Sequence, residues 1–142
     1  MIRLLTPAFI LTVSLFSCQS EHSKDEIVQA MRKYDRFIRE MQVDSIANLY
    51  SPNGNLGGVA IGRDSIKALL HKFENIKVIF QESTTDSIRI MADSAVHRGS
   101  YRQTDILPSA DTVTVTGRFI VNWKWFENDG WHIQRMTTIP DK

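Results

Sequence analysis

The sequence lacks several features that would point to a particular class of protein. It has one cysteine, Cys18, so no disulfide can form within the chain. No G-x-S-x-G sequence is present, so covalent serine or cysteine catalysis has no support. The formal net charge is +1, which provides no overall field to attract nucleic acid or an anionic membrane surface. What remains is an ordinary globular composition, and the 142 residues suit one domain with a real core.

Metal and phosphate motifs are also missing. No H-x-H or H-E-x-x-H spacing connects the four histidines, which are His22, His71, His97 and His132. Gly57-Gly58 and Gly62 before a helix resemble a phosphate loop only superficially. Arg63-Asp64 replaces the Lys-Ser/Thr pair of such loops, and an acidic first turn repels phosphate. We therefore expect no metal site and no cofactor.

The N-terminal 17 residues have the pattern of a secretory signal peptide. Arg3 precedes an apolar stretch from Leu4 to Phe16 that is too short to span a membrane as a helix. The ending Leu15-Phe16-Ser17-Cys18 resembles the lipobox of bacterial lipoproteins, in which the cysteine is lipidated and becomes the new N-terminus. The alternative is ordinary cleavage near the same point. We expect a signal peptide at 1–17, a polar tether at 18–23, and a lipid-anchored protein of the bacterial cell envelope.

The remainder, 24–142, reads as helices followed by long strands. Ser23-Lys24-Asp25-Glu26 is a capping box, and an apolar stripe then predicts a helix to about Gln42. Two shorter helices are expected at about 44–50 and 64–73. Strands are expected from Lys77 onward. This order predicts an α+β domain, in which three N-terminal helices pack on a strongly curved, mostly antiparallel sheet and leave a hollow for a pocket.

The most regular stretch is Val113 to Ile139, which predicts a long hairpin. One face carries Trp123 and Trp125, and the other carries Arg118 and Asn122. A three-residue loop at 128–130 would place Trp125 opposite Ile133. We assign the tryptophan face to the outside of the sheet and expect a homodimer through it, because so much apolar surface is rarely left exposed to water.

The order of elements and several local phrases resemble the nuclear-transport-factor-2-like superfamily, and within it the SnoaL-like proteins. These phrases are DSIANLYSPNG at 44–54, GRDSI at 62–66, GRFIVNW at 117–123 and DGWHI at 129–133. The resemblance covers almost all of 24–142 and implies a cone-shaped fold. It does not imply one activity, because the superfamily includes isomerases, cyclases, dehydratases, hydrolases and members without catalysis.

Ketosteroid isomerase is the member of that superfamily with the most informative site. The resemblance places Tyr34 at its oxyanion tyrosine, Gly58 at its catalytic base and Asn122 at its second acid. Glycine cannot accept a proton, which argues against the isomerase reaction.

The expected pocket residues are Tyr34, Asn122, His97 and Arg118. We expect Tyr34 and Asn122 to meet across the hollow, and His97 is alternatively a solvated or merely hydrogen-bonded histidine. The favoured function is a non-catalytic module that binds a small apolar molecule. The alternative is a cofactor-free isomerase, cyclase or hydrolase.

Overall fold

A computed structural model describes residues 22–142 of the chain. The elements follow in the order α1 (Lys24–Arg39), α2 (Val43–Leu49), β1 (Tyr50–Leu56), β2 (Ala60–Ile61), α3 (Arg63–His71), β3 (Lys77–Met91), β4 (Ser94–Ile106), β5 (Thr112–Phe126) and β6 (Gly130–Pro140). The predicted signal peptide, Cys18 and most of the tether lie outside the described residues. Among those described, no helix is both long enough and apolar enough to cross a membrane.

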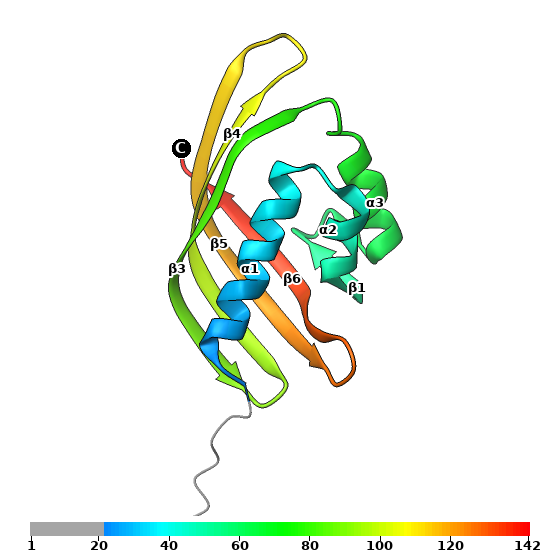
Figure 1. Cartoon of the computed structure of the whole chain (residues 1–142), viewed down its shortest axis with the longest axis vertical. Helices are drawn as coiled ribbons and strands as arrows, with labels where there is room; N and C mark the ends of the chain where they lie inside the picture. Colours follow the sequence, from blue (N-terminus) through cyan, green and yellow to red (C-terminus); the bar gives the residue numbers. More distant parts are fainter. Residues whose placement is uncertain (1–21) are drawn as a thin grey trace, which may run out of the picture.

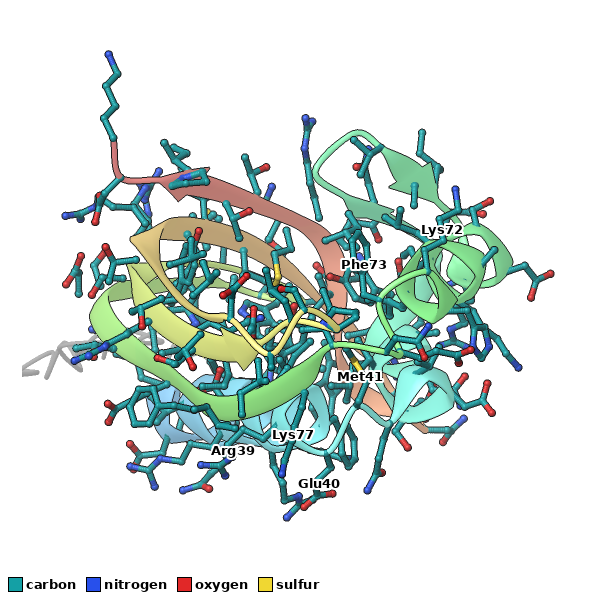
Figure 2. All side chains as sticks on the ribbon, turned by 90° about the horizontal axis from the view of Figure 1, so that it is seen from above. Arg39, Glu40, Met41, Lys72, Phe73 and Lys77 are labelled. Atoms are coloured by element: carbon teal, nitrogen blue, oxygen red, sulfur yellow. The ribbon has the colours of Figure 1, made fainter. Side chains whose placement is uncertain are left out.

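The strands form one sheet in the order β2-β1-β6-β5-β4-β3. All neighbouring strands are antiparallel except β1 and β6, which run parallel. Helix α1 lies across the inner face of this sheet, and α2 and α3 lie beside β1 (Figure 1). From above, the long strands curve around the interior (Figure 2). The predicted α+β fold with a curved, mostly antiparallel sheet is confirmed.

Helix α1 begins as its capping box predicts. The backbone N–H of Glu26 donates to Ser23 Oγ over 3.4 Å, which satisfies one of the amides that the first helical turn leaves unpaired. Ile27, Met31 and Ile38 then bury the apolar stripe against the sheet. The helix ends at Arg39, three residues before the predicted end at Gln42, and Met41 takes a positive φ of 48°.

The hairpin between β5 and β6 has a three-residue loop, but at 127–129 rather than at 128–130. Gly130, with a φ of 83°, is the first residue of β6 and pairs with Phe126. Trp125 therefore lies opposite Trp131, and the prediction that it faces Ile133 is wrong. The register of this pair of strands shifts between Asn122 and Trp123, where β6 has one extra residue.

The assignment of the two faces of β5 is also corrected. Phe119, Val121 and Trp123 belong to the core, in one cluster with Ile27 and Met31 of α1. Their face is therefore the inner one, and the prediction that it forms an outer dimer surface is wrong. The physical reason is that an antiparallel strand with one wet face turns its apolar set toward the core. Trp123 is only 2% exposed and cannot contact a partner.

Candidate functional site

A pocket of about 270 Å³ lies between α1 and the inner face of the curved sheet. Every long strand contributes to it, and the turn of helix α1 between Met31 and Tyr34 forms one wall. The lining side chains are Met31, Tyr34, Leu56, Gln81, Ser83, Tyr101, Gln103, Val115, Phe119, Met136 and Thr138. Most of this wall is apolar, with a few amide and hydroxyl groups among the aliphatic and aromatic side chains. That combination is typical of a binding site for a small organic molecule.

Three tyrosines belong to the site or its immediate wall. Tyr34 and Tyr101 line the pocket, and the buried Tyr50 hydroxyl donates to Met136 Sδ over 3.6 Å. Burial and the neighbouring Asp35 charge raise the pKa of Tyr34 to about 12, although a hydrogen bond with Tyr50 opposes the shift. Burial also raises the pKa of Tyr50 and, less strongly, that of Tyr101. These phenols are therefore neutral hydrogen-bonding groups near neutral pH.

Asp35 is a buried carboxylate beside the pocket that the sequence analysis missed. It is 7% exposed and accepts three hydrogen bonds from β3. Gln81 Nε2 and Ser83 Oγ donate to its Oδ1 over 3.0 and 2.7 Å, and the Ser83 backbone N–H donates to its Oδ2 over 2.9 Å. The carboxylate thus fixes the positions of two lining residues. A signal existed in the sequence, because position 35 falls four residues after Met31 and three before Ile38, on the buried stripe of α1.

A second carboxylate holds the other lining glutamine. Gln103 Nε2 lies 3.0 and 2.9 Å from the two carboxylate oxygens of Asp105. Both residues are partly buried and lie two apart on β4, so their side chains share the inner face of the strand. Sequence reasoning missed this pair as well, because a polar residue in a strand is ordinarily predicted to lie on the solvent-exposed face.

The structure does not bring the predicted pocket residues together. Tyr34 lines the pocket, as predicted. Asn122 is exposed on the outer face between the buried Val121 and Trp123, so the prediction that it meets Tyr34 is wrong. Arg118 lies on the same outer face, where its Nη2 donates to Asp86 Oδ2 over 2.6 Å. Both errors come from the inverted face assignment of β5.

His97 lies on the inner face but behind the pocket wall. It is fully buried, its Nε2 is 2.9 Å from Thr85 Oγ1, and its ring packs edge-on against the lining residue Phe119. Among the described residues, its Nδ1 has no hydrogen-bond partner. Burial lowers the pKa of His97 from 6.5 to about 4, so the ring is neutral under ordinary conditions. This position matches the alternative interpretation of His97, as a hydrogen-bonded histidine that does not line the pocket.

Gly58 lies in the exposed turn between β1 and β2, with a φ of 77° and its N–H donating to Asn55 Oδ1. A Cβ atom added there would have no atom within 4 Å beyond the neighbouring residues of the chain. The residue of this segment that lines the pocket is Leu56, which is equally unable to act as a base. Within residues 22–142, no group of three or more histidine, cysteine, aspartate or glutamate side chains is placed to hold a metal ion.

No family model matches the sequence, and no curated protein matches it. Solved structures do resemble the chain. A ketosteroid isomerase-like protein from Erwinia carotovora atroseptica has a TM-score of 0.74 and 16% identity, over 83% of this chain and 95% of that one. A nuclear transport factor 2-like superfamily protein from Salmonella enterica has a TM-score of 0.71 and 18% identity, over 83% and 90% of the two chains.

A third similar structure is a conserved protein from Planctomyces limnophilus, with a TM-score of 0.72 and 13% identity, over 82% of this chain and 95% of that one. At such low identity these structures establish the fold and not the activity. The described chain therefore has the nuclear-transport-factor-2-like fold, the cone-shaped α+β fold that the SnoaL-like proteins share.

Proposed function

We propose that this protein is an envelope lipoprotein whose domain binds a small, largely apolar molecule and does not transform it. The observation that carries the binding proposal is the pocket itself, in which apolar side chains surround a few fixed polar groups. The lining residues that the structure describes include no histidine, lysine, aspartate or glutamate that could exchange a proton near neutral pH. The two lining tyrosines have raised pKa values and serve as hydrogen-bonding groups only.

The binding proposal can be tested by mapping NMR chemical shifts while small aromatic and alicyclic compounds are added. Compounds that enter the pocket should shift the resonances of Tyr34, Tyr101 and Phe119. The substitution Val115→Trp fills the pocket and should abolish these shifts. Thr114→Trp is the matched control, because Thr114 is the exposed neighbour on β5 and does not line the pocket. Shifts that survive in Val115→Trp would place binding elsewhere.

An isomerase-type enzyme is the second candidate function. The observation in its favour is the half-buried Tyr34 with the Tyr50 hydroxyl beside it, an arrangement suited to hydrogen-bonding a developing oxyanion. The described lining residues include no base for it, and Gly58, at the position that the resemblance assigns to the base, lies in an exposed turn outside the pocket. Measurable isomerisation of a 3-oxo-steroid that disappears in Tyr34→Phe would establish this alternative and refute binding without turnover.

Lipidation at Cys18 accounts for the anchor in this proposal. The support is the apolar N-terminal stretch that ends at the lone cysteine of the chain. In cells, Cys18→Ser should leave the precursor uncleaved or release a soluble protein from the membrane fraction. A variant that still partitions with membranes at its mature size would contradict lipidation.

A further inference from the structure

We infer that the pocket selects neutral molecules that donate a hydrogen bond, such as alcohols and phenols, over ethers and carboxylates of the same shape. This inference rests on the proposed binding function and specifies its ligand class. It follows from the way in which two carboxylates, Asp35 and Asp105, hold the amide groups of the two lining glutamines.

Gln81 is the better defined of the two amides. Its side chain is 5% exposed and lines the pocket, and its Nε2 donates to Asp35 Oδ1 over 3.0 Å. Its Oε1 is buried and has no hydrogen-bond partner among the described residues. A buried acceptor without a donor is destabilised by the full loss of its hydration. A bound hydroxyl group can supply the missing donor, whereas an ether oxygen cannot.

The orientation of the Gln81 amide is set by chemistry and does not depend on an arbitrary choice between oxygen and nitrogen. The carboxylate of Asp35 only accepts hydrogen bonds, so the donating Nε2 must be the end that faces it. Asp35 is itself held by the Ser83 backbone N–H, a donor that cannot turn around. The acceptor end of Gln81 is therefore the end that remains for a ligand.

Gln103 repeats this arrangement on the neighbouring strand. Both oxygens of Asp105 face its Nε2, which leaves its Oε1 as the free end of the amide. The two glutamines lie directly opposite each other in the pairing of β3 with β4. Two lining residues on adjacent strands thus each have an amide oxygen that the carboxylate partner leaves unbonded, and the hydroxyls of Tyr34 and Tyr101 in the same lining can both donate and accept.

The charges around the site exclude anions. Within residues 22–142, no arginine, lysine or histidine lines the pocket. The charged groups bonded to lining side chains include the carboxylates of Asp35 and Asp105. A ligand carboxylate would lose its hydration and gain no cation in return, so its binding is disfavoured.

The test compares three probes with one ring system: 2-naphthol, 2-methoxynaphthalene and 2-naphthoate, titrated by calorimetry at pH 7 into the purified protein. One neutral hydrogen bond corresponds to an affinity ratio of about two- to tenfold. We expect 2-naphthol to bind tighter than its methyl ether by that factor, and 2-naphthoate to bind at least about tenfold weaker than 2-naphthol. An ether that binds as well as the alcohol, or a carboxylate that binds tightest, would overturn the inference.

Asp35→Asn provides a stricter test because it should turn the Gln81 amide. The oxygen of the introduced asparagine must face the fixed Ser83 N–H, so the NH2 group of the asparagine faces Gln81. That NH2 group donates, so the Gln81 amide should turn its Oε1 toward it in place of its Nε2. The preference for 2-naphthol over its ether should then vanish or reverse. Asp86→Asn is the control, because Asp86 pairs with Arg118 on the outer face and should leave the preference unchanged. An unchanged preference in Asp35→Asn would refute the role of Asp35.

Gln81→Met keeps the test decisive if Asp35→Asn does not fold. It removes the acceptor at nearly constant volume and should lower the naphthol preference without weakening binding of the ether. If none of the three probes binds to the wild-type pocket, the proposed binding function itself fails. If they bind in a way that Val115→Trp abolishes, but in a different order, only the ligand class is refuted.

Discussion

His97 shows how one buried residue couples the interior of the domain to pH. Its imidazole is fully buried, and burial lowers its pKa to about 4. As the pH falls, the unfolded chain protonates this residue first, near pH 6.5, whereas the folded protein does so only near pH 4. The free energy of unfolding therefore has its full value above pH 6.5 and declines as the pH falls toward 4. The full loss is about 3 kcal/mol at most, by the equivalence of one pKa unit with about 1.4 kcal/mol.

His97→Gln should therefore flatten the pH dependence of stability between pH 6.5 and about 4. Glutamine can keep a hydrogen bond to Thr85 Oγ1, which lies 2.9 Å from His97 Nε2, and it does not titrate. Urea unfolding at several pH values measures the slope for both proteins. Equal slopes over this interval would show that His97 is not the group responsible. Asp93, whose pKa is lowered by its hydrogen bond with Lys124, would act in a more acidic range in both proteins.

At the scale of elements, the curvature of the sheet depends on close backbone approach at two glycines. A methyl group added at Gly99 would lie 2.1 Å from the Thr84 backbone oxygen and 2.5 Å from Phe119 Cζ. One added at Gly117 would lie 2.4 Å from the Ile139 backbone oxygen. These contacts are far inside van der Waals distance, so β4 and β5 need glycine where they wrap around the pocket.

Gly99→Ala should lower the free energy of unfolding by about 2–3 kcal/mol, because overpacking against backbone atoms cannot relax by a change of rotamer. Urea denaturation compared with wild type measures this. Ser100→Ala, at the next position on the outer face, is the control and should change stability by no more than about 0.5 kcal/mol. A Gly99→Ala domain as stable as the control would show that the sheet can flatten at this point without loss.

The elements could be predicted from sequence more reliably than their faces. The capping box placed the start of α1, and the apolar alternation of β5 identified a long strand, because both signals are local. The choice of inner and outer face was not local. It followed from placing Asn122 in the pocket by the resemblance to ketosteroid isomerase, whereas the burial of Val121 and Trp123 turns the other face of β5 inward. Neighbouring residues of a strand lie on opposite faces, so a transferred position that is wrong by one residue puts the wrong face of the strand inside.

The pocket itself was only partly predictable for a related reason. Tyr34 was found through the resemblance to ketosteroid isomerase, and its place on the apolar stripe of α1 turned it toward the sheet. The sequence did not identify the polar lining residues Gln81, Ser83 and Gln103. A polar side chain on a strand is predicted to face solvent unless a buried hydrogen-bond partner is known. That partner, Asp35, is 46 residues away from Gln81 in the chain, and only the fold brings the two together.

For the molecule as a whole, the homodimer stays a prediction, but through a different set of residues. The inner face is filled by the core, so the outer face of the sheet is the one left uncovered by the described helices (Figure 1). Ile120 is half-buried at the middle of this face, opposite Arg98 on β4. If two copies pair there, Ile120→Glu should reduce the mass found by light scattering from dimer to monomer. A wild-type protein that is already monomeric at micromolar concentration would refute the dimer.

The central claim is that the interior pocket carries a small molecule, and mass spectrometry of the purified protein tests it most directly. The protein is purified under native conditions and extracted with organic solvent, and the extract is compared with extracts of Val115→Trp and Thr114→Trp. We predict a stoichiometric neutral compound in the wild type and in Thr114→Trp, and its loss in Val115→Trp, whose new side chain occupies the pocket. An empty wild-type protein, or a compound retained equally by all three proteins, would contradict this claim.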